Sequence, residues 1–140
     1  MNTRAPRSKC PISCSLDLFG DRWTLLVLRD LLFLGKQRFR EFLESPEGIA
    51  SNILTDRLRR LESAGLIERK PDQNDKRRNL YAATASGRDL APILTEIANW
   101  GAVHTNSTPP EDVARILGGD DMAGVHERLA GTLQGGNDID

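Results

Sequence analysis

Small polar and basic side chains gather between positions 51 and 78 of this 140-residue chain. Side chains of these types can bind nucleic acid, because short hydroxyl and amide groups reach base edges while cations bind phosphate oxygens. The stretch ends on Lys76-Arg77-Arg78, the strongest basic cluster in the sequence. Together with one arginine upstream, the candidate contact residues are Arg38, Ser51, Asn52, Thr55, Arg57, Arg59, Lys76, Arg77 and Arg78. A charge run alone is usually a solvated turn, so its meaning depends on the elements around it.

The charges are divided unevenly along the chain. Residues 1–78 hold 16 Lys+Arg against 11 Asp+Glu, a net +5, whereas residues 79–140 hold 3 against 9, a net −6. This asymmetry favours an anionic partner for the first part of the chain, while the acidic remainder keeps the total near neutral.

Catalytic and metal-binding patterns are missing from the sequence. There is no glycine-rich phosphate loop, no Gly-x-Ser-x-Gly motif and no His-containing metal motif, so we expect neither an enzyme nor a cofactor. Cys10 and Cys14 are too few for a disulfide framework, and with His104 and His126 they give no zinc spacing, so we expect no metal. No run approaches the roughly 18 apolar residues of a membrane-spanning helix, and the polar, basic start has no apolar stretch behind it. We therefore expect a cytoplasmic protein without membrane contact.

The apolar spacing of the first half predicts three helices before position 45. Pro11 suits the start of the first. Asp21 has the side chain of an N-cap for an apolar helix over residues 22–34, which Gly35 ends. In that helix, Trp23 is expected to be a core anchor rather than a ligand-stacking residue. A short helix over residues 38–44 then turns three apolar side chains inward, Phe39, Phe42 and Leu43, before a breaker at 45–48.

The next helix, predicted over residues 51–64, is amphipathic. Its buried stripe has leucines at i, i+4 and i+7, namely Leu54, Leu58 and Leu61. Asn52, Asp56 and Arg59 lie almost directly opposite this stripe. Arg57 lies nearer the stripe, which leaves open whether it pairs with an acidic neighbour or binds phosphate. The role of Asp56 is open as well, because a carboxylate on this face would repel phosphate.

Two strands and a long helix follow. The strands, over residues 66–70 and 79–83, flank polar turn formers and predict a hairpin with a long charged tip. Thr84 caps a helix that extends to His104 and carries an apolar stripe in need of a partner. The stripe consists of Leu90, Ile93, Leu94, Ile97 and Trp100. Beyond Pro109-Pro110, two short helices and a frayed glycine-rich end are expected.

This order of elements is typical of a mainly α fold with a small β-hairpin, the winged helix-turn-helix. In that fold one helix enters the major groove of DNA, and the hairpin, or wing, contacts flanking backbone or the minor groove. We therefore predict that helix 51–64 reads DNA through Asn52, Thr55 and Arg59, and that the wing, residues 70–79, clamps it through residues 76–78. The alternative is a winged-helix module that docks on a protein through the face formed by residues 51–60.

The sequence resembles the HxlR family of bacterial regulators, a MarR-like winged-helix group. The resemblance covers residues 10–104 and leaves a flexible basic arm at 1–9 and a C-terminal helical extension at 105–140. Its motifs are Cys10-Pro11, Gly20-Asp21-Arg22-Trp23-Thr24, Arg38-Phe39, Gly48-Ile49, Asn52-Ile53-Leu54-Thr55-Asp56-Arg57-Leu58, Leu61-Glu62, Gly65-Leu66-Ile67, Tyr81, Thr84, Gly87 and Trp100. Two positions depart from the pattern: Ala50 stands where a capping serine is frequent, and Ala83 where leucine is usual. We expect Ser51 to take over the cap, which shifts the helix start by about one residue.

The resemblance implies a homodimeric repressor or activator that binds double-stranded DNA at an inverted-repeat operator. It places the dimer interface on the first helix and on the long helix after the wing, at Ile12, Leu16, Leu90, Leu94, Ile97 and Trp100. Several family members sense oxidants or electrophiles with a cysteine at the position of Cys10, and a helix N-terminus beside Lys9 favours its thiolate. The alternative is that Cys10 only packs at the dimer contact. An oxidant or another small-molecule effector is thus a candidate partner.

Overall fold

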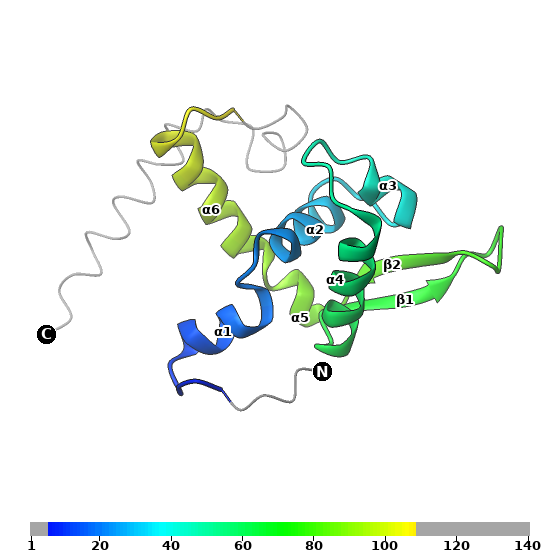
Figure 1. Cartoon of the computed structure of the whole chain (residues 1–140), viewed down its shortest axis with the longest axis horizontal. Coiled ribbons are helices and arrows are strands. Elements are labelled where there is room, and N and C mark those ends of the chain that lie inside the picture. Colours follow the sequence, from blue (N-terminus) through cyan, green and yellow to red (C-terminus); the bar gives the residue numbers. More distant parts are fainter. Residues whose placement is uncertain (1–5, 109–140) are drawn as a thin grey trace, which may run out of the picture. The chain divides into compact units, whose positions relative to one another are not determined.

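The computed structural model describes residues 6–108, which fall into two units, Met1–Ala91 and Pro92–Asp140. The first unit contains five helices and one hairpin among its described residues (Figure 1). These elements are α1 (Pro11–Phe19), α2 (Arg22–Leu32), α3 (Phe39–Leu43), α4 (Ser51–Ser63), β1 (Ile67–Pro71), β2 (Asn79–Ala83) and α5 (Ala85–Arg88). The second unit contains α6 (Ala91–His104) from its second residue onward. The short helices expected after Pro110 lie outside the described residues.

Helix α2 is the centre of the first unit. The Asp21 carboxylate accepts a hydrogen bond from the Thr24 amide at 3.2 Å, so the predicted N-cap is confirmed. The helix buries Val27, Leu28 and Leu31, whereas Trp23, the expected core anchor, is only half-buried. The most completely buried residue of this helix is Leu28, which has no exposed surface.

Helix α4 packs against α2 and α3 through the predicted leucine stripe. Leu54, Leu58 and Leu61 are all buried, as the i, i+4 and i+7 spacing predicted. The expected cap by Ser51 is wrong, because Ala50 is the N-cap residue and makes no side-chain cap. Ser51 is already the first helical residue, and its carbonyl accepts the Thr55 hydroxyl at 2.9 Å.

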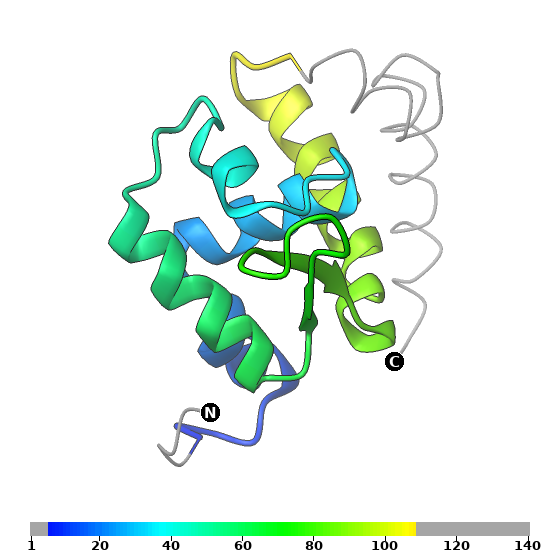
Figure 2. The same ribbon diagram turned by 90° about the vertical axis from the view of Figure 1, so that its right-hand side faces the viewer.

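The two strands form an antiparallel hairpin, with Ile67 opposite Ala83 and Pro71 opposite Asn79. The first strand begins one residue later than predicted, because Leu66 belongs to the turn after Gly65. Gly65 has φ +76°, a left-handed conformation that ends α4 and turns the chain into the wing. Figure 2 shows the side of the molecule from which the hairpin projects, and α3 and α4 lie on the same side. The amphipathic helix and the wing therefore share one side of the first unit.

The single helix predicted from Thr84 to His104 is two helices. Thr84 caps the short helix α5 by accepting the Gly87 amide, and the chain then turns at Asp89 and Leu90 before α6 begins. Pro92 accounts for the break, because it has no amide hydrogen to bond the Arg88 carbonyl and its ring would clash there. In α6, Leu94 and Asn99 are buried, while Ile93, Ile97, Trp100 and Val103 are exposed.

Candidate nucleic-acid interface

The outward face of α4 presents Asn52 and Arg59 without internal partners. Both side chains are exposed, and no hydrogen bond or ion pair joins either to another residue in the described part of the chain. Thr55 is half-buried, and its hydroxyl hydrogen is used by the Ser51 carbonyl, so its oxygen can only accept. Ser51 is exposed at the first turn. Of the predicted base-facing set, Asn52 and Arg59 thus have donors to spare.

Arg57 is tied to other elements of the protein. Its Nε donates to Asp21 Oδ2 at 2.7 Å, and its Nη1 donates to Asp56. Burial opposes ionisation of Asp21, but hydrogen bonds from Thr24 and Arg57 hold its pKa below the ordinary value. The same Asp21 contact raises the pKa of Arg57. This ion pair joins the start of α2 to the middle of α4, so Arg57 fixes the position of α4.

Asp56 acts within this face as a partner for arginines. Its carboxylate accepts from Arg57 and lies 3.0 Å from Nε of Arg60, one helical turn on. Two guanidinium groups therefore offset its negative charge, which answers the objection that it would repel phosphate.

The wing tip is an ordered turn that exposes all three cations. The Asp72 amide donates to the Arg78 carbonyl at 2.8 Å, and the Arg78 amide donates to the Asp75 carbonyl at 3.0 Å. Arg77 and Arg78 also pair with the Asp75 carboxylate, at 3.3 and 3.5 Å. Such solvent-exposed pairs are weak and exchange readily for another anion. Lys76 is exposed as well.

Arg38 lies at the start of α3, where its Nη1 donates to Asp72, the residue that follows β1 and begins the tip of the wing. The Arg38 amide is in turn accepted by the Glu41 side chain at 2.9 Å, which holds the first turn of α3. The sequence pattern predicted Arg38 as a DNA contact but gave no sign of its acidic partner 34 residues away. An aspartate two positions before Asn74 is a turn signal that could have drawn attention to Asp72.

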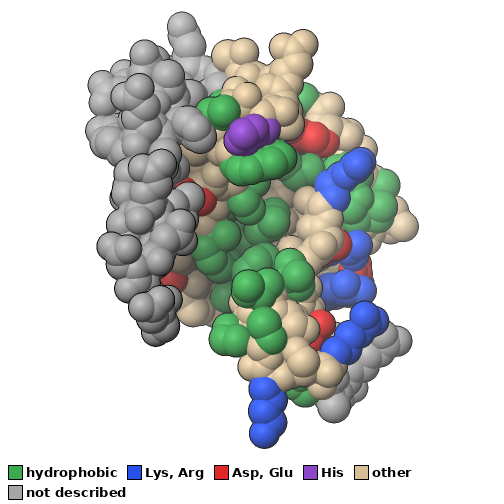
Figure 3. All heavy atoms as spheres, turned by 90° about the vertical axis from the view of Figure 1, so that its left-hand side faces the viewer, with side chains coloured by type: hydrophobic (Ala, Val, Ile, Leu, Met, Phe, Trp, Pro, Cys, Tyr) green, Lys and Arg blue, Asp and Glu red, His purple; other side chains and the backbone are tan. Residues whose placement is uncertain are grey.

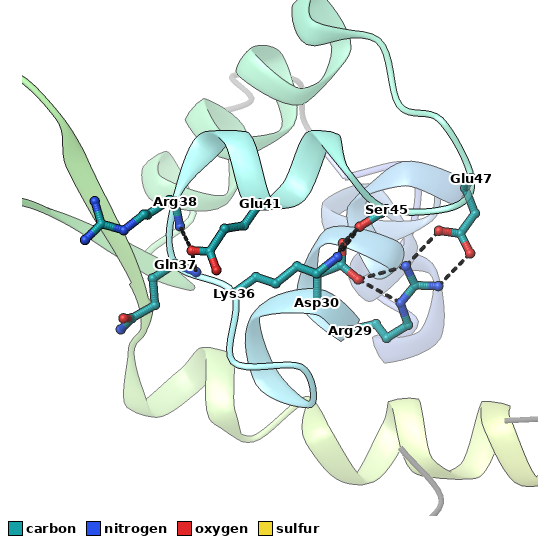
Figure 4. Close-up of polar contacts among 8 residues, drawn as sticks. All are labelled: Arg29, Asp30, Lys36, Gln37, Arg38, Glu41, Ser45 and Glu47. Atoms are coloured by element: carbon teal, nitrogen blue, oxygen red, sulfur yellow. Dashed lines mark hydrogen bonds and ion pairs between the residues drawn. The ribbon is translucent and has the colours of Figure 1, made fainter. Parts of the chain in front are cut away.

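A polar cluster joins the end of α2 to the turn before α4 (Figure 4). Asp30, only 2% exposed, accepts from Arg29 Nη2 at 2.8 Å and from the Ser45 hydroxyl. Lys36 Nζ donates to Ser45 at 2.7 Å, and Arg29 makes two 2.8 Å bonds to Glu47. The Glu47 contact raises the pKa of Arg29, and Arg29 lowers the pKa of Glu47. Because Ser45 and Glu47 precede α4, this cluster fixes where α4 begins.

This cluster was not predicted from the sequence. The available signal was a lone acid, Asp30, beside Leu31 on the apolar face of a helix, since buried carboxylates are almost always paired. The distant members of the cluster could not be named, because Ser45 lies 15 positions after Asp30, and Glu47 lies 18 positions after Arg29, which it binds.

Cys10 is the exposed N-cap residue of α1, and its amide donates to the Ser8 hydroxyl at 3.2 Å. Cys14 is half-buried and lies one turn along the helix, with its thiol directed to the Ser8 carbonyl at 3.4 Å. Both thiols are free. Cys10 is therefore accessible to a small reagent in the single chain.

Each of the two units exposes hydrophobic side chains, and some of them are visible in Figure 3. On α1 the exposed ones include Ile12 and Leu16, at 71% and 55%. On α6, Ile97 and Trp100 are exposed at 49% and 62%. Leu90 and Leu94, which were predicted at the same interface, are already buried in the single chain. Four of the six predicted interface residues are thus available to a partner.

The described residues offer neither a metal site nor a membrane-spanning helix. Residues 6–108 contain no group of three or more His, Cys, Asp or Glu side chains that could hold a metal ion. Within the same range, none of the helices has both the length and the apolar character needed to cross a bilayer.

Comparison with known proteins gives a consistent result. A model of the HxlR-like helix-turn-helix family matches residues 18–109. An HTH-type transcriptional regulator of Synechocystis is 38% identical over 93 residues, which cover 66% of this chain and 68% of that protein. One of Mycobacterium tuberculosis is 40% identical over 87 residues, 62% of this chain, and the chain spans about half of its length, 54%. Among solved structures, the redox regulator HypR in its oxidised form matches with a TM-score of 0.62 and 30% identity, over 70% of this chain and 100% of that one.

Proposed function

The chain belongs to the HxlR-like helix-turn-helix family of transcription regulators, and on this basis we propose that it binds double-stranded DNA as a homodimer. In this proposal α4 enters the major groove and the wing contacts the flanking backbone or minor groove. The observation that carries it is the exposure of Asn52 and Arg59 on α4, because this helix lies on the side of the unit that also carries the wing tip. Residues 10–104 would form the working domain, with residues 1–9 and 105–140 as appendages.

The contact residues have different roles in this proposal. Asn52 and Arg59 read base edges, and Ser51 and the helix N-terminus bind phosphate. Lys76, Arg77 and Arg78 bind backbone or minor groove, because their own ion pairs are solvent-exposed and weak. Arg57 orients α4 instead of reading bases, because Asp21 and Asp56 engage two of its donors and its side chain is only 18% exposed.

The test of this function is binding to mixed-sequence duplex DNA over a salt series, followed by fluorescence anisotropy. Each phosphate contact releases counterions, so log K should fall linearly with log salt, with a slope of about −0.9 for each phosphate neutralised. Absence of binding even at low salt would support the alternative, a winged-helix module that docks on a protein.

Replacement of Asn52 by alanine is expected to change which sequences are bound. An asparagine that pairs with adenine discriminates against the wrong base by about 1–3 kcal/mol, so one position in each half-site should lose its preference. Selection from randomised duplexes, followed by sequencing, measures this effect. Asn106→Ala is the matched control, because Asn106 is exposed and follows α6, outside the unit that contains α4 and the wing. An unchanged base preference in Asn52→Ala would remove this residue from the reading set.

We propose that the dimer forms through the exposed apolar residues of α1 and α6, namely Ile12, Leu16, Ile97 and Trp100. Two-fold symmetry then requires inverted half-sites about one helical turn, or roughly 34–36 Å, apart. The double substitution Ile97→Glu and Trp100→Glu should convert the dimer to a monomer in light scattering, because carboxylates would be buried without partners. Glu96→Gln on the same helix should leave the mass unchanged. A dimeric double variant would place the interface elsewhere.

Cys10 is proposed as an oxidant sensor, since its thiol is exposed at a helix N-terminus and the similar protein HypR is a redox regulator. Peroxide should release DNA from the wild-type protein and from Cys14→Ser, but not from Cys10→Ser. A Cys10→Ser protein that responds to peroxide as the wild type does would leave Cys10 as a packing residue. Anisotropy before and after peroxide gives the answer.

A further inference from the structure

Asp72 is the point where the wing meets the helix-turn-helix. It follows the last residue of β1, and its amide continues the hairpin by donating to the Arg78 carbonyl at 2.8 Å. Its surface is 2% exposed, whereas the tip residues 73–78 are exposed except for the half-buried Asp75. A covered carboxylate at the tip of a surface hairpin calls for an explanation, because charged groups are rarely buried unless they are paired.

The two oxygens of the Asp72 carboxylate serve two different segments. Oδ1 accepts the Asn74 amide at 2.9 Å and so closes the first turn of the tip. Oδ2 accepts Nη1 of Arg38, the residue that begins α3. The Asn74 amide and the Arg38 guanidinium hold the pKa of Asp72 below its ordinary value, so the carboxylate is ionised at neutral pH. One side chain therefore joins the tip of the wing to the helix-turn-helix.

A second contact joins strand β2 to the residue before Arg38. The Tyr81 amide of β2 donates to the Gln37 carbonyl at 2.8 Å. Gln37 directly precedes Arg38, whose side chain extends toward the hairpin strands in Figure 4. The tip of the wing and β2 are thus both attached to residues 37–38. The backbone contact survives any side-chain change, whereas the contact from Asp72 depends on its charge.

Arg38 retains donors after it has paired with Asp72. A guanidinium group has five N–H donors, and only Nη1 is engaged with another described residue. Its side chain is 42% exposed, so the remaining donors are open to a phosphate. Asp72 therefore fixes the orientation of Arg38, which is the group that contacts the ligand. A carboxylate that accepts a hydrogen bond from a metal-binding histidine orients that histidine in the same way.

We propose that Asp72 is a positioning residue for DNA binding, which orders the wing tip and orients Arg38 toward the phosphate backbone. The inference rests on the proposed function. Ordering the tip before binding lowers the entropic cost of forming the complex. The proposal therefore predicts that the Asp72 carboxylate raises the affinity for DNA. Simple repulsion between this carboxylate and the phosphates predicts that it lowers the affinity.

The sign of the effect is tested with Asp72→Asn and Asp75→Asn in the full chain. Both remove one negative charge from the tip, but the Asp75 carboxylate contacts only Arg77 and Arg78 within the tip. Asp72→Asn should weaken binding to mixed duplex DNA by about tenfold, which corresponds to loss of one charged hydrogen bond. Asp75→Asn should bind as tightly as the wild type or more tightly. Equal or tighter binding by Asp72→Asn would overturn the proposal.

A second measurement, made without DNA, separates this inference from the proposed function. In Asp72→Asn the amides of Asn74 and Arg78 should exchange with solvent about tenfold faster than in the wild type, while those in α4 stay protected. Circular dichroism checks that the helices remain folded. Unchanged exchange at the tip would refute the positioning role whether or not the wild type binds DNA. Absence of wild-type DNA binding with faster tip exchange would refute the proposed function and, with it, a role of Asp72 in DNA binding.

Discussion

Replacement of Arg77 and Arg78 together by alanine is expected to weaken binding to every duplex sequence by roughly ten- to a hundredfold and to flatten the salt slope by about two. Arg77 has a side chain that is 92% exposed, and its pairing with Asp75 at 3.3 Å lies in solvent. A phosphate can therefore displace that partner at little cost. Because both contacts are to backbone, the sequence preference should not change.

The matched control for this experiment is the double variant Arg69→Ala and Lys70→Ala. These cations lie on β1 of the same hairpin and pair with Glu62 and Glu68, at 3.7 and 3.3 Å. The control removes the same charge from the wing but leaves the tip intact, so we expect a smaller loss of affinity. Anisotropy over a salt series measures both variants. Equal losses of affinity in the two double variants would mean that only the net charge of the hairpin matters. An unchanged affinity in the double variant of Arg77 and Arg78 would show that the tip is not part of the interface.

Replacement of Asp30 by alanine is expected to lower the free energy of unfolding by about 3 kcal/mol. Removal of one partner from a buried ion pair leaves the other charges without compensation, which typically costs 3–5 kcal/mol. The lower end applies here, because the side chains of Arg29 and Lys36 are 22% and 19% exposed and retain some water. The Ser45 hydroxyl also loses its acceptor. The loss would be a large part of the 5–15 kcal/mol that holds a typical domain together.

Urea unfolding followed by circular dichroism measures this change as a shift in midpoint at constant slope. Glu47→Ala is the control, because Glu47 binds the same Arg29 from the exposed rim of the cluster. An exposed pair contributes about 1 kcal/mol or less, so the control should be close to the wild type. If Asp30→Ala and Glu47→Ala lower the free energy of unfolding by the same amount, Asp30 is not the residue on which the stability of the cluster depends. The comparison also tests whether the turn before α4 depends on a buried charge.

Most elements of the fold were predictable, because local signals specify them. The spacing of Leu54, Leu58 and Leu61 fixes the buried face of α4, and Asp21 caps α2 where the sequence placed the cap. Predictions were wrong where a local signal was overlooked or could be satisfied in two ways. Pro92 breaks the long helix into α5 and α6, and helix α4 begins without a side-chain cap although Ser51 was available.

The candidate site was predicted less completely, because the sequence gives residue types and faces but not long-range partners. Asn52 and Arg59 could be placed outward from helical spacing alone, and both are exposed. Arg57 lies in the same basic stretch, yet its charge is engaged by Asp21, 36 residues earlier. Periodicity describes one helix and says nothing about which acid of another element lies beside it.

Within this chain, the sequence alone determined that a basic, amphipathic helix precedes a hairpin with a cationic tip. Tertiary structure decided which cations are free. Arg59 and Lys76 are exposed, Arg57 is held by Asp21, and Arg38 is paired with Asp72 but keeps donors that are open to solvent. The physical reason is that a charge is free or engaged according to what lies within about 4 Å of it, and these pairs are created only when distant segments pack together.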